Sequence, residues 1–207
     1  MYTDRVHGGR RLAEVLAGET VDVVLGVPRG GVIVAAEVSR ACEAVLDVAV
    51  GRKIAAPHSP ELAIGAAAAG GVRFIDEERC RLLAIPLEWI EAETARAAAE
   101  VTRREQAYRG GRQAADLTGR SVAVVDDGAA TGATLVAVLR SVGIQRPDRL
   151  LCAVPVASRD AMHLLEPEAD RVVSPCVPRR FYAVGQWYED FRQTTDDEVL
   201  ASLGVGE

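Results

Sequence analysis

The chain has 207 residues, 49% of them apolar and 4% aromatic, which suits one α/β domain with a core of alanine, valine and leucine and is short for two independent domains. The formal charge of −6, with a single lysine and no basic block, argues against a general surface for nucleic acid or membranes. The four cysteines are scattered and form no Cys-x-x-Cys pair, so we expect them to be reduced thiols. We see no signal peptide and no membrane-spanning stretch, and we therefore expect a cytoplasmic protein.

Strand and helix patterns alternate along most of the chain. Uninterrupted apolar runs are typical of strands buried on both faces, and apolar residues spaced three or four apart are typical of helices. The expected order is helix 4–17, strand 21–27, helix 32–42, strand 45–50, strand 72–75, helix 86–108, strand 121–126, helix 133–142, strand 149–154, helix 159–165, strand 171–174 and a short last helix after Thr195. This alternation favours an α/β fold with a mostly parallel central sheet flanked by helices and joined by right-handed crossovers.

Two segments do not fit this alternation. Residues 54–71 lack periodicity and hold two prolines, four consecutive alanines and a Gly-Gly pair, so we expect a mobile loop with short β pieces. Residues 181–191 hold five of the nine aromatic residues. We therefore expect a single domain over 1–207, with a core at about 19–175, a small hood at about 176–207, and the long helix 86–109 as a candidate part of that hood.

The most informative segment begins at the end of strand 121–126. Two carboxylates, Asp126 and Asp127, follow four apolar residues and precede a loop of small residues and hydroxyls that runs into helix 133–142. The carboxyl ends of parallel strands are where α/β proteins bind ligands, and the following helix points free N–H groups and its positive dipole end at the loop. The sequence therefore predicts a phosphate site made by Gly128, Ala129, Ala130, Thr131, Gly132, Ala133 and Thr134.

The acid pair indicates what accompanies that phosphate. Carboxylates accept hydrogen bonds from paired hydroxyls, and they suit Mg²⁺ that is bound partly through substrate oxygens. A phosphate with a diol nearby describes a ribose 5-phosphate, with Asp126 and Asp127 on the ribose and metal side. The alternative is an Asp-rich turn that only caps a helix, with Thr131 as the N-cap residue. The coincidence of strand, acid pair, loop and helix favours the ligand site.

Residues 126–134, Asp-Asp-Gly-Ala-Ala-Thr-Gly-Ala-Thr, resemble the 5-phosphoribosyl-1-pyrophosphate (PRPP) signature of the type I phosphoribosyltransferases. The order of the other elements extends the likeness over most of the chain, which is most similar to uncharacterised bacterial phosphoribosyltransferase-like proteins. The resemblance implies the type I phosphoribosyltransferase fold, with the acid pair on the ribose 2- and 3-hydroxyls and residues 128–134 around the 5-phosphate. It also implies Mg²⁺ held mainly by PRPP, with Asp126 and Asp127 nearby.

A second candidate segment lies just after strand 21–27 and consists of Pro28, Arg29, Gly30 and Gly31. A glycine-rich turn with exposed N–H groups and one arginine suits a pyrophosphate, although taken alone it is also an ordinary strand-to-helix turn. The resemblance places the pyrophosphate of PRPP against this turn. It also makes the bond between Pro28 and Arg29 a candidate for a non-proline cis peptide.

Arg52 and Lys53 form the only adjacent Arg-Lys pair, and we expect them to finish the second strand. Two neighbouring cations at a buried strand end repel each other unless an anion joins them, and the resemblance places a basic residue here against pyrophosphate. A solvated strand end is the alternative. Residues 55–61 occupy the place of the family's closing loop but hold no lysine or arginine, which departs from several members.

The aromatic segment supplies candidates for the acceptor side. It loosely resembles the base-side segment of hypoxanthine-type phosphoribosyltransferases, which implies Tyr182 stacking on a base and Glu189 or Asp190 as a metal-side acid, with Trp187 as a further base-side candidate. The alternative is a packed hood whose aromatics are simply core. Ala130 stands where several 6-oxopurine members carry a carboxylate, which lowers the expectation of guanine or hypoxanthine.

Together these features predict a Mg²⁺-dependent enzyme that transfers the 5-phosphoribosyl group of PRPP to a nitrogenous base or amine and releases pyrophosphate. One alternative is a PRPP- or nucleotide-binding regulatory protein of the same fold without transferase activity, and another is the same fold recruited to a different activity. We expect PRPP and an unidentified acceptor as partners, with no nucleic acid and no membrane. The sequence leaves a homo-oligomer open and singles out no general base.

Overall fold

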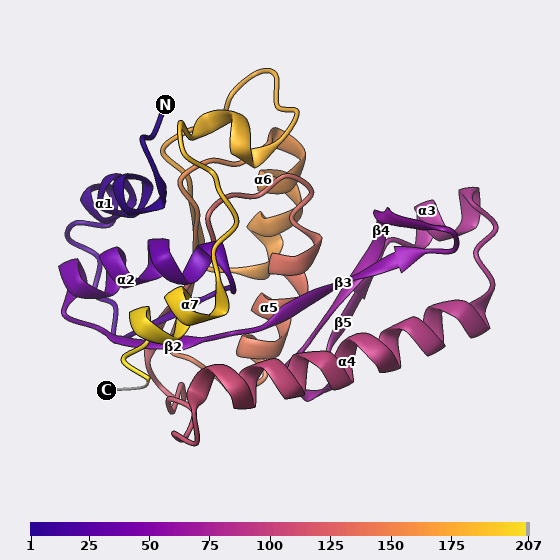
Figure 1. Cartoon of the computed structure of the whole chain (residues 1–207), viewed down its shortest axis with the longest axis horizontal. Helices are drawn as coiled ribbons and strands as arrows, with labels where there is room; N and C mark the ends of the chain where they lie inside the picture. The colour runs from indigo at the N-terminus through magenta and orange to yellow at the C-terminus, as the bar shows by residue number, and fades with distance from the viewer. Residues whose placement is uncertain (206–207) are drawn as a thin grey trace.

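Five parallel strands form the central sheet of the computed structural model, which describes residues 1–205. Their bounds are β1 Val23–Gly26, β2 Val45–Val48, β6 Ser121–Val125, β7 Arg149–Ala153 and β8 Arg171–Val173. The strand order is β2-β1-β6-β7-β8, and every neighbouring pair is parallel. Figure 1 shows the whole chain, with β2 labelled at one edge of this sheet. The parallel α/β fold predicted from the sequence is confirmed, with strands slightly shorter than predicted.

Helices cover both faces of this sheet. They are α1 Arg5–Val15, α2 Gly30–Cys42, α5 Ala133–Gly143, α6 Arg159–Leu165 and the short α7 Asp196–Ser202. Side chains alternate along β6, so Ala123 and Val125 pack in the cluster of α1 and α2, whereas Val122 and Val124 pack in the cluster of α5 and α6. Because both faces are buried, the strand has no polar alternation, and this explains its uninterrupted apolar run.

Several helices, among them α1, α6 and α7, begin at a residue whose side chain accepts a hydrogen bond from a helix amide, whereas α2 and α5 have no such cap. The carboxylate of Asp4 accepts a hydrogen bond from the His7 amide at 2.7 Å, and the hydroxyl of Ser158 accepts one from the Ala161 amide at 2.9 Å. Thr195 and Glu198 form a reciprocal capping box at the start of α7, the short last helix predicted after Thr195. Short 3₁₀ helices cover Ala69–Gly71, Glu166–Glu168 and Val184–Trp187.

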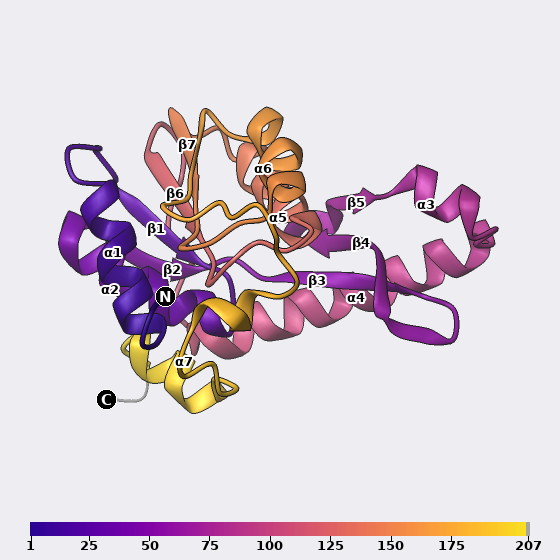
Figure 2. The ribbon, with the colours of Figure 1, turned by 90° about the horizontal axis from the view of Figure 1, so that it is seen from above.

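A three-stranded antiparallel sheet projects from the central sheet as an arm (Figure 2). It consists of β3 Gly51–Ala56, β4 Ser59–Ala68 and β5 Arg73–Ile75, with α3 Glu77–Leu82 near the tip and α4 Leu87–Arg109 running along it. The expectation of a mobile loop over residues 54–71 is therefore wrong for most of this segment, which forms β3 and β4. Helix α3 was not predicted at all.

The alanines of β4 form a strand because helices approach both of its faces closely. Ala66 and Ala68 are buried in the cluster that contains α5, and Ile64 and Ala67 are buried in the cluster that contains α4. Small side chains let two helices pack against one hairpin, and strand preference depends on this kind of fit more than on the residue itself. The low intrinsic strand preference of alanine therefore misleads a reading of the sequence alone.

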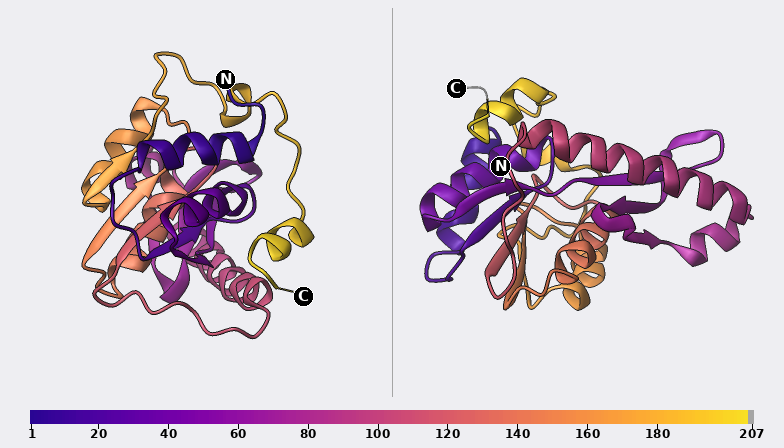
Figure 3. Two further views of the ribbon diagram at one scale, coloured as in Figure 1. Left: turned by 90° about the vertical axis from the view of Figure 1, so that its left-hand side faces the viewer. Right: turned by 90° about the horizontal axis from the view of Figure 1, so that it is seen from below.

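The first residues of the chain lie beside residues 187–190 of the C-terminal segment (Figure 3). The amide of Tyr2 donates to the carbonyl oxygen of Trp187 at 2.8 Å, and the amide of Glu189 donates to the carbonyl oxygen of Tyr2 at 2.9 Å. We call residues 184–192 the C-terminal strap. Residues 206–207, the end of the predicted hood, lie outside the described residues.

Helix α4 runs along the arm, and its C-terminal half reaches α7. There Val101 and Tyr108 pack with Val199 and Leu203 in one buried cluster. The long helix thus connects the arm to the end of the chain. Within residues 1–205, no helix combines the length and the apolar character that crossing a membrane requires.

Candidate functional site

The loops that follow β1 and β6 meet at one edge of the central sheet because these strands are neighbours. Gly26 pairs with Val125 in the register, and the amide of Val27 donates to the carbonyl oxygen of Val125 at 2.8 Å. The turn 28–31 therefore begins beside the acid pair. The peptide bond between Pro28 and Arg29 is cis, as predicted.

Gly30 and Gly31 lie directly against the two carboxylates. A Cβ atom on Gly30 would stand 2.9 Å from Cγ of Asp127 and closer still to its Oδ2. A Cβ atom on Gly31 would stand 2.6 Å from Oδ1 of Asp126. Both glycines are therefore required for close approach, and the structure brings the turn 28–31 and the acid pair together.

The predicted phosphate loop is fixed at its middle and open at its end. The amide of Ala129 donates to the carbonyl oxygen of Val156 at 2.9 Å, and the Ser158 hydroxyl donates to the carbonyl oxygen of Ala130 at 2.6 Å. Gly132 takes a positive φ of 78° as the residue before α5. Within the described part of the chain, the amides of residues 131–135 have no protein acceptor. They form a ready anion site at the start of a helix.

The two carboxylates of the acid pair share a partly buried position. The amide of Asp127 donates to Oδ1 of Asp126 at 2.8 Å. Burial, and then the charge of Asp127, raise the pKa of Asp126 well above its usual range. Burial also raises the pKa of Asp127, against the opposing effect of a nearby arginine. Such a pair is stabilised by a cation or by several hydroxyl donors.

The acid pair fits Mg²⁺ that is held mainly through a bound ligand. Among residues 1–205 there is no group of three or more His, Cys, Asp or Glu side chains that could hold a metal ion by itself. Mg²⁺ commonly binds through one or two carboxylates together with substrate phosphates and water. Asp126 and Asp127 provide such a partial set of ligands.

Arg5, at the start of α1, is a site residue that the sequence did not indicate. Its Nε lies 2.8 Å from Oδ2 of Asp127, and its Nη1 donates to the carbonyl oxygen of Arg192 at 2.8 Å. Its guanidinium carbon lies 4.0 Å from the centre of the Phe191 ring. Only 12% of the side chain is exposed. An arginine in a polar N-terminal segment gives no sequence signal for a contact 122 residues away.

The C-terminal strap touches the phosphate loop through residues other than those proposed for the base side. The Tyr188 hydroxyl donates to the backbone oxygen of Asp127 at 2.6 Å, and Val184 lies so close to Gly128 that a Cβ there would meet it at 2.5 Å. Tyr188 is buried, and neither it nor Val184 was among the predicted site residues. The strap therefore fixes the backbone at the acid pair.

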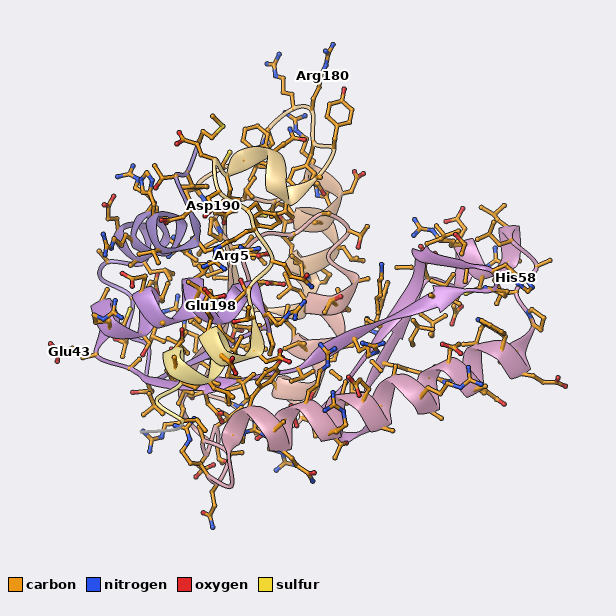
Figure 4. All side chains as sticks on the ribbon, viewed as in Figure 1. Arg5, Glu43, His58, Arg180, Asp190 and Glu198 are labelled. Atoms are coloured by element: carbon orange, nitrogen blue, oxygen red, sulfur yellow. The ribbon has the colours of Figure 1, made fainter. Side chains whose placement is uncertain are left out.

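The predicted base-side residues are scattered around the strap. Tyr182 is 82% exposed, and Trp187 packs in the cluster around Tyr2. Glu189 is exposed on the strap. Asp190 lines a cavity of about 190 Å³ between α1, α2 and the strap, which Arg5 and Glu198 also line. Figure 4 shows these three labelled residues close together, with Arg180 pointing away at the edge of the molecule.

Arg52 and Lys53 belong to β3 of the arm, so the expectation that they finish the second parallel strand is wrong. Successive side chains of a strand face opposite ways. Gly51 shares its face with Lys53, and a Cβ on Gly51 would lie 2.5 Å from Cγ2 of Thr134. Arg52 shares its face with Ile54, which packs in the cluster of α4. Lys53 therefore faces the phosphate-loop side, and Arg52 faces the side of α4.

Arg29 lies at the outer side of its turn, near the start of α7. Its Nη1 is 3.9 Å from Oδ1 of Asp196, and that oxygen also accepts a hydrogen bond from the Tyr108 hydroxyl at 2.6 Å. About a third of the arginine side chain is exposed, at 32%. The guanidinium is thus loosely held beside the turn.

Comparisons with known proteins agree on one family. A family model described as the phosphoribosyl transferase domain matches residues 5–182. Two curated proteins of Mycobacterium tuberculosis strains, provisionally named phosphoribosyl transferases, are 42% identical over 206 residues, which cover 98% of this chain and 46% of theirs. The chain therefore spans about half the length of these curated relatives.

Two solved structures extend the comparison. The TT1426 protein from Thermus thermophilus is 43% identical with a TM-score of 0.81, over 98% of this chain and 97% of its own. A Neisseria gonorrhoeae protein solved with bound ppGpp is 17% identical with a TM-score of 0.55, over 100% of this chain and 95% of its own. This second likeness concerns the fold alone.

Proposed function

Because the chain belongs to the phosphoribosyl transferase domain family, we propose that it binds PRPP with Mg²⁺ and transfers the 5-phosphoribosyl group to a nitrogenous acceptor. One observation carries this proposal. An acid pair and a row of open helix-terminal amides lie at the same sheet edge, beside a glycine turn that contacts both acids. Amides of this kind bind phosphate, and carboxylates bind a sugar diol.

The roles follow from these positions. The amides of residues 131–135 hold the 5-phosphate, and the carboxylates of Asp126 and Asp127 accept hydrogen bonds from the ribose hydroxyls. The Arg29 side chain, the backbone amides of residues 29–31, and Lys53 on the facing side of β3 hold the pyrophosphate. Asp126 and Asp127 would help to hold Mg²⁺ together with oxygens of PRPP, and the ion would supply positive charge against the phosphates.

The reaction breaks the bond between the anomeric carbon of PRPP and pyrophosphate and forms a bond to the acceptor nitrogen. Positive charge develops on the sugar as the bond breaks, and the two carboxylates of the acid pair stabilise it. The site residues contribute to the rate mainly by holding PRPP and the acceptor nitrogen in line. No side chain of the described residues is assigned the removal of the acceptor proton.

The acceptor is a nitrogenous base or amine other than a typical 6-oxopurine. Ala130 supplies no carboxylate at the position before Thr131. Tyr182, with 82% of its surface exposed, is the candidate that could stack on a planar ring of the acceptor. The four cysteines are free thiols, which supports a reducing compartment such as the cytoplasm.

The first test is binding of PRPP in the presence of Mg²⁺, measured by isothermal titration calorimetry. Asp127→Asn keeps the shape of the side chain but removes its charge, so PRPP affinity should fall at least about tenfold. The melting temperature should also fall, because Arg5 loses the charged partner of a largely buried ion pair, so binding is compared at a temperature where both proteins are folded. Asp116→Asn is the matched control, because Asp116 is exposed and bonds only to the nearby Thr118 amide. Equal affinity of wild type and Asp127→Asn contradicts the assignment of the acid pair.

The second test separates an enzyme from a regulatory PRPP-binding protein. Pyrophosphate release is measured with PRPP, Mg²⁺ and a panel of adenine, pyrimidine bases and simple amines. Acceptor-dependent release supports the transferase. Tight PRPP binding without release for any acceptor favours the regulatory alternative.

A further inference from the structure

The guanidinium of Arg5 lies where four segments of the chain converge. It comes from the first residue of α1, it pairs with Asp127 after β6, and it donates to the backbone of the strap at Arg192. A Cβ on Gly30 of the turn 28–31 would also stand against Nε of Arg5. A single side chain therefore contacts the acid pair, the glycine turn and the strap.

Arg5 is fixed in place rather than poised to move. Its Nε, its Nη1 and the flat face of its guanidinium each have a partner, namely a carboxylate, a carbonyl oxygen and the Phe191 ring. Its side chain is 12% exposed, and that of Asp127 is 16% exposed. The planar fork of arginine satisfies such a set of partners at once, which the point charge of lysine does not.

The ion pair leaves part of Asp127 for a ligand. Arg5 occupies Oδ2, while Oδ1 accepts no hydrogen bond from another side chain among the residues that the structure describes. A carboxylate with one oxygen held by a fixed guanidinium presents its other oxygen in one direction. Without Arg5, the carboxylate would be free to rotate, and two neighbouring negative charges would lack a countercharge in contact.

We propose that Arg5 is a positioning residue that holds the Asp127 carboxylate in the orientation needed to accept hydrogen bonds from the ribose diol of PRPP. This inference rests on the proposed function of the acid pair. It assigns Arg5 a much larger effect on the sugar end of the ligand than on the pyrophosphate end, because the guanidinium pairs with Asp127 and only packs against the turn 28–31. The arginine touches Asp127 and not the reacting atoms.

The test compares two ligands in Arg5→Gln, which retains hydrogen-bond donors but no charge. We expect PRPP to bind about tenfold or more weakly than to wild type, whereas inorganic pyrophosphate with Mg²⁺ binds within about twofold. Arg5→Lys should lie between Arg5→Gln and wild type for PRPP. Arg10→Gln is the matched control, because Arg10 lies on the same helix as Arg5 and 68% of its side chain is exposed. Arg10 pairs with Glu37 of α2 at 3.0 Å.

A double-mutant cycle with Asp127→Asn sharpens the test, because Arg5→Gln should add little to the loss of PRPP affinity already caused by Asp127→Asn.

If Arg5→Gln does not fold, as judged by thermal unfolding, Arg5→Lys decides: a loss of PRPP affinity with unchanged pyrophosphate affinity supports the inference. Equal losses for both ligands, unchanged PRPP affinity, or tighter PRPP binding overturns it. Failure of the wild type itself to bind PRPP overturns the proposed function and the inference with it.

Discussion

Replacing Gly30 by alanine tests the geometry of the site with a single methyl group. Gly30 does not have a positive φ, so alanine can adopt its backbone conformation, and the effect comes from contact alone. The new Cβ would lie 2.9 Å from Cγ of Asp127 and closer to both its Oδ2 and Nε of Arg5. Ordinary carbon contacts begin at about 3.5 Å, so the carboxylate and its arginine must shift by roughly 1 Å.

This shift should affect ligand binding more than folding. Overpacking of one methyl group in a tight place costs about 1–3 kcal/mol of unfolding free energy. A misplacement of about 1 Å in a positioning group can cost about 100-fold in function. We therefore expect Gly30→Ala to bind PRPP about 10- to 100-fold more weakly while it still unfolds cooperatively at a somewhat lower temperature.

The assay is calorimetric titration with PRPP and Mg²⁺, accompanied by thermal unfolding of the same samples. Gly143→Ala is the matched control, because Gly143 ends α5 and no atom lies within 4 Å of the position of its Cβ. That variant should bind PRPP normally and be equally or slightly more stable. If Gly30→Ala binds PRPP within threefold of wild type at an unchanged melting temperature, the close packing of the glycine turn on the acid pair is wrong.

Three further substitutions test other parts of the site. Asp126→Asn should weaken PRPP binding yet raise the melting temperature at pH 7.5. Burial raises the pKa of this carboxyl, so the wild type loses stability as the pH rises above the pKa of about 4 that the carboxyl has in the unfolded chain. Thermal unfolding should show that the gain in melting temperature shrinks towards pH 4. Lys53→Gln should weaken binding of inorganic pyrophosphate more than Arg52→Gln, and the reverse order in titrations would reject the assignment of strand faces. Tyr188→Phe removes the hydrogen bond to the Asp127 backbone, so we expect about 1 kcal/mol less stability in denaturant unfolding and a several-fold weaker PRPP affinity, and a neutral result would mean that this contact does not hold the loop.

The elements of the central sheet could be predicted because their signals are local. The apolar run of β6, the glycine before α5 and the Thr195 capping box each lie within a few residues of the structure they specify. The acid pair and the turn 28–31 could be placed together because parallel neighbouring strands end at one edge. These parts could be predicted because each depends on a local sequence pattern or on the end of a strand that such a pattern identifies.

The arm and the contacts of Arg5 could not be predicted, because they depend on distant partners. The alanines of β4 are strand residues only because α4 and α5 cover them, and nothing within residues 54–71 encodes that cover. Arg5 and Tyr188 reach Asp127 from 122 and 61 residues away. A residue whose role is to orient another has no motif of its own.

The pairing of residues 2 and 3 with the strap has a consequence for which part of the protein opens first on heating. The strap is held to Tyr2 and Thr3 by a few backbone hydrogen bonds and by one small buried cluster around Tyr2 and Tyr188, whereas the sheet beneath has a larger buried cluster on each face. Segments with few buried contacts open locally at a lower free energy than the whole domain unfolds. The contact between residues 2–3 and the strap should therefore open first and release Arg5 and Tyr188 together. Loss of activity on heating should then precede melting of the central β-sheet.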